Sequence, residues 1–173
     1  MSGPVVVLVG PPGAGKSTVG RALADRLGVP LVDTDAEVER AAGRTISDIF
    51  VQDGEAAFRD LERAAVLHAL EDDRACVLAL GGGAVMQDPV ARALEEAPVP
   101  VVFLDVTIAD AASRVGFDTS RPLLLVNPRA SWTRLMNARR PTYERLADHH
   151  VQTGGRSPEA VVDEVADRVG ERP

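Results

Sequence analysis

Aromatic residues and cysteine are both scarce in this sequence of 173 residues. Only 3% of the residues are aromatic, whereas proteins that stack nucleic-acid bases on exposed rings need such side chains. The one cysteine, Cys76, excludes an internal disulfide. Because Cys76 sits in an apolar run, we expect a reduced and unreactive core thiol.

Positive charge is also in short supply, since 19 basic residues face 26 acidic ones and the net charge is −7. Proteins that bind the phosphate backbone normally present a basic face, so we expect no nucleic-acid partner. No apolar run is long enough to cross a bilayer, and residues 1–4 lack the basic and apolar regions of a secretory signal. The sequence therefore predicts a cytoplasmic protein without a membrane partner, and we expect a monomer.

Short β-branched runs alternate with longer helical patterns along the chain, which is typical of a parallel sheet covered by helices. The expected strands are residues 5–9, 31–33, 76–80, 101–104 and 149–153. The expected helices are residues 16–27, 54–70, 89–96, 107–115, 132–147 and 158–169. Because neither a repeat nor a linker interrupts this pattern, we expect a single α/β domain over residues 1–173.

A polar segment at residues 116–129 separates two of the expected helices. It contains glycine, serine, threonine, asparagine and two prolines. A polar, proline-bounded loop of this length is typical of a segment that closes over a site. We therefore expect a mobile lid at residues 114–128.

A phosphate-binding loop follows the first expected strand, at residues 10–18, with the sequence Gly-Pro-Pro-Gly-Ala-Gly-Lys-Ser-Thr. It matches the Walker A pattern, and a strand before it and a helical pattern after it complete the expected context. In such a loop the backbone N–H groups and the helix N-terminus bind phosphate oxygens. The expected nucleotide-binding residues are Gly13, Ala14, Gly15, Lys16, Ser17 and Thr18.

Lys16 is the only lysine in the sequence, and every other basic residue counted is an arginine. A compact ammonium on a flexible stem suits the space between phosphates better than a planar guanidinium does. We therefore expect Lys16 to reach the β- and γ-phosphates as a catalytic cation, and the Ser17 hydroxyl to ligate Mg²⁺. The alternative is a glycine-rich turn that matches the pattern by chance.

Two carboxylates, Asp33 and Asp35, end the second expected strand. The carboxyl ends of parallel strands converge on the ligand crevice, so we expect both acids near the nucleotide. Asp33 is expected to hold a hydrated Mg²⁺, and Asp35 to accept the proton of an attacking hydroxyl. A helix N-cap at Asp35 is the alternative, and the two roles can coexist. Asp105 resembles a Walker B acid, but we expect it to be a strand-end or cap residue.

Three arginines and three consecutive glycines form a second group of candidate site residues. Arg59 falls in an expected helix, Arg121 in the expected lid, and Arg139 in an Arg-Arg-Pro-Thr-Tyr motif. Glycines 81–83 follow the third strand and would let a ligand approach the backbone closely, or simply make a flexible turn. Glu62, one turn after Arg59, is expected to tether that arginine, unless the two form an ordinary surface pair.

Taken together, these motifs resemble the shikimate kinase family in order and spacing over nearly the whole chain. The matching segments are residues 10–18, 33–35, 58–59, 81–83, 121–124 and 139–143. The resemblance implies the P-loop NTPase fold of nucleoside-monophosphate kinases, with a five-stranded parallel sheet flanked by helices. It also implies a substrate-binding region at residues 34–62 and a mobile lid.

The activity implied by the resemblance is phosphoryl transfer from ATP to the 3-hydroxyl of shikimate, with one Mg²⁺. By the same resemblance, Asp35 binds the acceptor hydroxyl and serves as base, while Arg59, Arg139 and the backbone of Gly82 hold the shikimate carboxylate. Bidentate pairing of guanidinium with carboxylate suits that orienting task.

The nucleotide side of the resemblance involves three further arginines. Arg121 would swing in with the lid toward the transferred phosphoryl group, as a catalytic and ATP-binding residue. Arg114 and Arg156 align with positions near the adenine nucleotide.

Two other functions remain open from the residues alone. A gluconate- or nucleoside-monophosphate-type kinase shares the loop, although Arg59 with Arg139 favours a carboxylate acceptor and Asp35 favours a hydroxyl. A domain that binds ATP without transferring phosphate would have no need of Asp35 beside the arginines.

Overall fold

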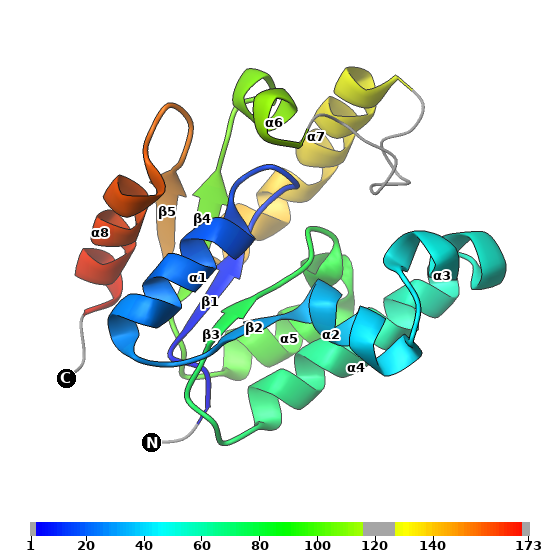
Figure 1. The fold of residues 1–173 in the computed structure, drawn as a ribbon, viewed down its shortest axis with the longest axis horizontal. Helices are drawn as coiled ribbons and strands as arrows, with labels where there is room; N and C mark the ends of the chain where they lie inside the picture. Colours follow the sequence, from blue (N-terminus) through cyan, green and yellow to red (C-terminus); the bar gives the residue numbers. More distant parts are fainter. Residues whose placement is uncertain (1–2, 116–126, 171–173) are drawn as a thin grey trace.

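The computed structural model describes residues 3–115 and 127–170, without the side chains of residues 113–115. Its centre is a sheet in the order β2-β3-β1-β4-β5, in which every neighbouring pair of strands is parallel (Figure 1). The strands are β1 (Val6–Val9), β2 (Leu31–Asp33), β3 (Val77–Ala79), β4 (Val101–Asp105) and β5 (His149–Gln152). The expected five-stranded parallel sheet is confirmed, with each strand within one residue of its expected ends.

The three central strands are buried because their side chains are apolar on both faces. Every residue of β1, β3 and β4 is buried, including Asp105 at the end of β4. Parallel sheets with helices on both faces favour such continuous apolar runs. The middle of the sheet is therefore a rigid base, and all of its strands end at the same edge.

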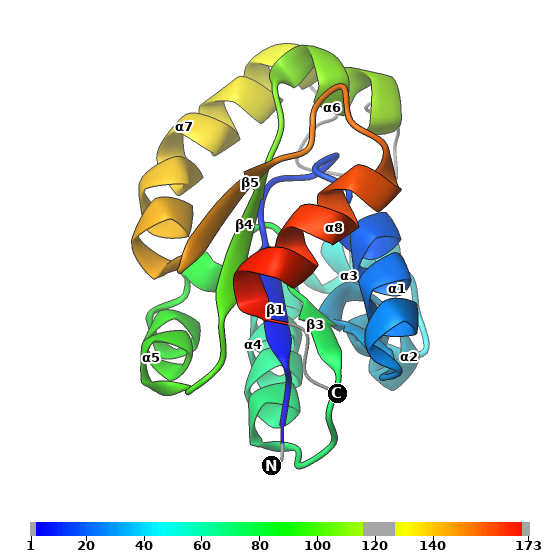
Figure 2. The same cartoon turned by 90° about the vertical axis from the view of Figure 1, so that its left-hand side faces the viewer.

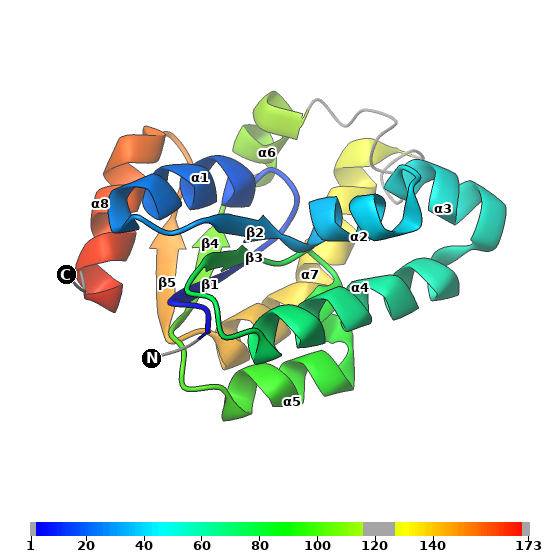
Figure 3. The same ribbon diagram turned by 60° about the horizontal axis from the view of Figure 1, so that its bottom comes forward.

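Helices cover both faces of the sheet. Helices α1 and α8 lie on one face, whereas α4, α5 and α7 lie on the other (Figures 2 and 3). The helices are α1 (Lys16–Leu27), α2 (Thr34–Ala42), α3 (Ile46–Asp53), α4 (Glu55–Glu71), α5 (Asp88–Glu96), α6 (Ile108–Val115), α7 (Pro128–Leu146) and α8 (Pro158–Val169), with a short 3-10 turn, η1 (Ala84–Met86). Of the helices in residues 3–115 and 127–170, none combines the length and the apolar character needed to cross a membrane.

Helix α3 was not expected from the sequence, and α2 was considered only as a possible helix capped by Asp35. They form a small layer beside the sheet together with the start of α4, around a separate apolar cluster of Val38, Ile49 and Phe58. Each contributes only one large buried apolar side chain to this cluster, so its own hydrophobic stripe is short. Their stability therefore depends on packing between segments, which local periodicity does not show.

The two ends of the expected lid fall in helices. Residues 114 and 115 belong to α6, and Pro128 begins α7, because a proline is well tolerated in the first turn of a helix. Residues 116–126, the rest of the expected lid, lie outside the described residues. Helix α7 also starts four residues before the expected position 132.

Candidate active site

The phosphate-binding loop leaves the carboxyl end of β1, at the centre of the sheet, and runs into α1 (Figure 1). Gly10, Gly13 and Gly15 have φ angles of 150°, 85° and 92°. Side chains other than hydrogen are rarely tolerated in this region. A Cβ at Gly10 would also clash with the carbonyl oxygen of Leu104 on β4. The glycines therefore let the loop turn tightly against the sheet.

Lys16 begins α1, and its ammonium folds back over the loop. Its Nζ donates hydrogen bonds to the carbonyl oxygens of Gly10 at 2.7 Å and Pro11 at 3.0 Å. The N-cap residue, Gly15, has no side chain to cap the N–H groups of the first turn. This end of α1 therefore combines an ammonium, backbone donors and a helix dipole, which suits phosphate oxygens.

Asp33 joins the phosphate-binding loop to the start of α2. Its Oδ2 accepts a hydrogen bond from the Ser17 hydroxyl at 2.7 Å, while Oδ1 accepts from the backbone N–H groups of Asp35 at 3.0 Å and Ala36 at 3.4 Å. Asp33 is therefore the N-cap of α2, and the cap role considered for Asp35 is wrong. The reason is that the helix begins one residue before Asp35, directly after the extended backbone of Asp33.

Ser17 and Asp33 are chemically suited to Mg²⁺. Hydroxyl and carboxylate oxygens are hard ligands, and Mg²⁺ in phosphotransferases takes its remaining ligands from water and phosphate. A larger protein cage is unnecessary for such an ion. Consistently, the described part of the chain holds no cluster of three His, Cys, Asp or Glu side chains that could bind a metal.

The three glycines after β3 lie against three of the residues singled out in the sequence. A Cβ at Gly81 would lie 2.7 Å from Oδ1 of Asp35, and one at Gly82 would lie 3.0 Å from Nη1 of Arg139. A Cβ at Gly83 would lie 2.6 Å from Nη1 of Arg59. The carboxylate and both guanidinium groups therefore meet along one short stretch of backbone.

This stretch also touches the phosphate-binding loop. The Cβ position at Gly82 lies 3.3 Å from Cδ of Pro12 and 3.5 Å from the carbonyl oxygen of Gly10. The nucleotide loop and the acid–arginine group thus occupy the same edge of the sheet.

Arg59 is held in place by a buried carboxylate. Its Nη1 donates to Oε1 of Glu62 at 2.7 Å, and the Glu62 side chain is only 1% exposed. Gln87 donates a further hydrogen bond to the same oxygen at 3.3 Å. The contact expected between Arg59 and Glu62 is present, and the alternative of an ordinary surface pair is wrong because Glu62 is buried.

Arg139 and Tyr143 lie one turn apart on α7, and both are buried. The Tyr143 hydroxyl donates a hydrogen bond to the carbonyl oxygen of Gly82. Burial raises the pKa of Tyr143 to about 12, against smaller opposing effects of Arg139 and Arg59. The phenol therefore stays protonated at neutral pH and remains a donor that fixes the Gly82 backbone.

Two supporting residues were missed in the sequence. Thr34, which is fully buried, accepts a hydrogen bond from the N–H of Gly81 at 3.1 Å. Trp132 donates through Nε1 to the carbonyl oxygen of Pro12 at 2.9 Å. Thr34 could have been identified from the sequence because it lies between two candidate acids. The contact of Trp132 with Pro12 spans 120 residues, so no local sequence pattern indicates it.

Arg156 lies on the other side of the phosphate-binding loop from the acid–arginine group. A pocket of about 250 Å³ is lined by Arg156 together with Gly15, Thr18, Thr153 and others. The guanidinium donates to the backbone oxygen of Gln152 and to Glu164, both at less than 3 Å. These bonds hold Arg156 beside the loop, where a nucleotide base or ribose could lie.

The structure describes no side-chain position for the remaining two arginines of the expected nucleotide site. Arg114 falls in the last turn of α6, but its side chain lies outside the described residues. Arg121 lies wholly outside them. Their expected contacts with ATP therefore rest on the sequence resemblance.

Comparison with known proteins identifies a family for this arrangement. The family model for shikimate kinase matches residues 12–170. The chain is 55% identical to a shikimate kinase of Thermobifida fusca, over 95% of this chain and 94% of the relative, and 52% identical to one of Streptomyces coelicolor, over 98% and 97%. Among solved structures, a shikimate kinase from Acinetobacter baumannii in complex with shikimate matches with a TM-score of 0.92 at 35% identity, over 98% of this chain and 93% of that one.

Proposed function

The chain belongs to the shikimate kinase family, and from that membership we propose how its described residues bind and phosphorylate the acceptor. The family is one of ATP-dependent kinases with the P-loop fold of nucleoside-monophosphate kinases. The reaction transfers the γ-phosphoryl group of ATP to the 3-hydroxyl of shikimate, giving shikimate 3-phosphate and ADP.

Arg59 and Arg139 hold the shikimate carboxylate. They lie beside consecutive glycines, so their guanidinium groups reach the same small space from α4 and α7. The backbone N–H of Gly82 adds a donor between them. Two guanidinium groups fix both the position and the rotation of a carboxylate, and this orients the ring for in-line attack.

Asp35 binds the acceptor hydroxyl and takes up its proton as the oxygen attacks the γ-phosphorus. Its carboxylate lies against Gly81, next to the glycine that faces Arg139. As the new P–O bond forms, the bond to the bridging oxygen of ADP breaks. A carboxylate within hydrogen-bond reach of the hydroxyl is suited to this general-base role.

Lys16 and the backbone of residues 13–18 bind the phosphates of ATP, and Arg156 lines the nucleotide pocket on the other side of the loop. By family resemblance, Arg121 approaches the transferred group and Arg114 contacts the nucleotide. Phosphoryl transfer needs mainly positioning and neutralisation of charge, which this set of cations supplies.

Ser17 and Asp33 hold the Mg²⁺ that accompanies ATP. When bound there, the ion would supply positive charge that neutralises the phosphates during transfer. The contact between Ser17 Oγ and Asp33 Oδ2 supports this pairing, because it brings the two oxygens to 2.7 Å.

We propose that the protein acts as a monomer and forms one kinase domain, with residues 34–62 as its substrate-binding region. The scarcity of cysteine favours a reducing compartment, and we propose a cytoplasmic location.

The observation that carries this proposal is the row of contacts of Asp35, Arg139 and Arg59 with glycines 81–83. The test is release of ADP from Mg-ATP in parallel reactions with shikimate, gluconate and AMP. We expect release well above background only with shikimate. Turnover with gluconate or AMP in place of shikimate would contradict the acceptor assignment, and release without any acceptor dependence would contradict the kinase activity.

A further inference from the structure

The carboxylate of Asp105, at the carboxyl end of β4, is almost fully buried and is committed to side chains from two other elements. Arg140 of α7 donates to both of its oxygens, at 2.8 Å and 2.9 Å. His150 and Gln152 of β5 approach Oδ2 at 2.8 Å and 3.2 Å, and the N–H of Val106 donates to Oδ1 at 2.8 Å. Both oxygens are therefore engaged with the protein itself.

Arg140 is the neighbour of Arg139 in the sequence, but the two side chains leave α7 in different directions. Arg139 reaches toward Gly82, whereas Arg140 reaches β4. Pro141, the next residue, lies inside the helix and lacks an N–H, so the main-chain hydrogen bond to Asn137 is absent. At this turn, α7 relies on side-chain anchors to fix its position.

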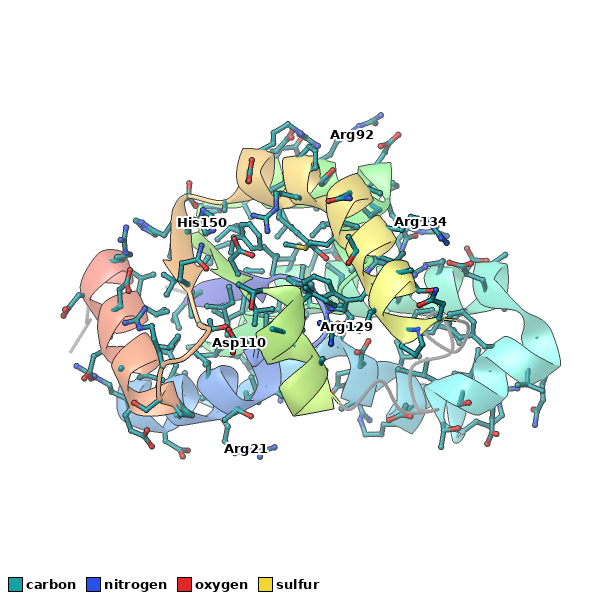
Figure 4. The ribbon with its side chains drawn as sticks, turned by 90° about the horizontal axis from the view of Figure 1, so that it is seen from above. Arg21, Arg92, Asp110, Arg129, Arg134 and His150 are labelled. Carbon is teal, nitrogen blue, oxygen red and sulfur yellow. The ribbon has the colours of Figure 1, made fainter. Side chains whose placement is uncertain are left out.

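The ring of Phe103 on β4 supports the same anchor. His150 stacks on it with ring centroids 4.7 Å apart, and Arg140 lies over it at 5.7 Å. Tyr143, one turn further along α7, packs against the same ring at 5.1 Å and donates to Gly82. Figure 4, seen from above, labels His150 on β5 near the C-terminal half of α7.

We propose that Asp105 is a positioning residue for acceptor binding: by holding Arg140, it fixes the turn of α7 from which Arg139 reaches the acceptor carboxylate. The inference rests on the role proposed for Arg139. It differs from a Walker B role, in which Asp105 would serve the metal and nucleotide. The bidentate pair with Arg140 favours the positioning role, because it ties Asp105 to α7, the helix that carries Arg139.

The test is Asp105→Asn in the full chain, which keeps the shape of the side chain but removes its charge. The main-chain hydrogen bonds of Asp105 to Thr153 remain possible. Among the described residues, Arg140 then retains only the more exposed Glu144, at 3.5 Å, as a charged partner. We expect the KM for shikimate to rise roughly tenfold and the KM for ATP to stay within about twofold, since only acceptor binding depends on this turn.

A double variant shows whether Asp105 acts through Arg140. Arg140→Gln alone should raise the KM for shikimate by a similar factor, and Asp105→Asn with Arg140→Gln should add little to either single change. The matched control is Glu95→Gln. It removes the exposed carboxylate that pairs with Arg145, which lies on α7 as Arg140 does. We expect this control to leave both KM values unchanged.

Each outcome has a distinct meaning. A rise in the KM for ATP or in the Mg²⁺ requirement, with the KM for shikimate unchanged, would overturn the inference in favour of a metal-linked role. Additive effects in the double variant would also overturn it. Arg139→Lys distinguishes the positioning inference for Asp105 from the role proposed for Arg139. If Arg139→Lys raises the KM for shikimate while Asp105→Asn does not, the positioning inference alone fails. If Arg139→Lys has no effect, the proposed role of Arg139 fails as well.

Discussion

At the scale of single residues, glycines 81–83 do more than let a ligand approach the backbone. Each occupies a position where a methyl group would meet a side chain of the site, respectively Asp35, Arg139 and Arg59. The absence of side chains therefore lets one acid and two arginines converge. A sequence pattern of three glycines suggests space for a ligand, but only the fold shows which side chains use that space.

Gly83→Ala tests this account, because the negative φ of Gly83 (φ −98°, ψ −2°) does not require glycine. The new methyl group would lie 2.6 Å from Nη1 and 2.9 Å from Cζ of Arg59, so the guanidinium must move. We expect the KM for shikimate to rise about 5- to 30-fold, equivalent to roughly 1–2 kcal/mol, with little change in the KM for ATP. Steady-state kinetics with each substrate varied measures both values.

Gly28→Ala is the control for a general effect on stability. Gly28 ends α1 at φ 68° and has open space around its Cβ position. Alanine there should lower the free energy of unfolding by about 1 kcal/mol without changing either KM. Equal KM effects in the two variants would mean that Gly83→Ala acts through stability and not through Arg59.

At the scale of elements, the sequence predicted the sheet well because β1, β3 and β4 are continuous apolar runs buried on both faces. Helix α3 was not predicted, and α2 only as a possible helix capped by Asp35, because the cluster of Val38, Ile49 and Phe58 takes one buried apolar side chain from each of three helices. The charged site residues were identified from motifs, whereas supports such as Trp132 depend on contacts that only the fold creates. Chemistry-bearing residues were thus easier to predict than the residues that position them.

The start of α2 gives a prediction of its own, because Asp33 is both the N-cap of this helix and a proposed Mg²⁺ ligand. Asp33→Ser keeps a capping oxygen, so we expect a free energy of unfolding within about 0.5 kcal/mol of the unchanged protein, whereas Asp33→Ala should cost about 1 kcal/mol. Both variants lose the carboxylate, and both should lose most of kcat. Urea denaturation and steady-state kinetics measure the two effects; full activity in Asp33→Ser would limit Asp33 to capping.

At the scale of the whole molecule, an acidic protein concentrates cations at one edge of its sheet. The net charge is −7, yet Lys16, Arg59 and Arg139 lie at the same edge of the sheet. The buried acid Glu62 pairs with Arg59, and the buried acid Asp105 pairs with Arg140 beside Arg139, so charge is balanced locally. This edge of the sheet can therefore attract anions although the molecule as a whole is negative.

The Asp105 anchor predicts how stability depends on pH. Burial alone would raise the pKa of Asp105. Hydrogen bonds from Arg140 and His150 outweigh the effect of burial, so the pKa of Asp105 lies below its ordinary value of 3.8. Because the folded-state pKa is lowered, the ionised group stabilises the fold above pH 3.8, and this contribution is lost as pH falls through the lower folded-state value.

The difference in free energy of unfolding between the unchanged protein and Asp105→Asn should therefore be largest near neutral pH and shrink below about pH 4. Urea denaturation at a series of pH values measures it. A difference that stays constant down to the lowest pH would show that the Asp105 charge does not stabilise the fold.

The central claim is that Asp35 takes up the proton of the acceptor held by Arg59 and Arg139, and the kinetics of Asp35→Asn test it most directly. We expect kcat to fall at least about a hundredfold, while the Kd for ADP stays within about threefold. Asp60→Asn, which changes an exposed carboxylate paired with Arg63, should leave both values unchanged. A kcat for Asp35→Asn close to that of the unchanged protein would contradict the account.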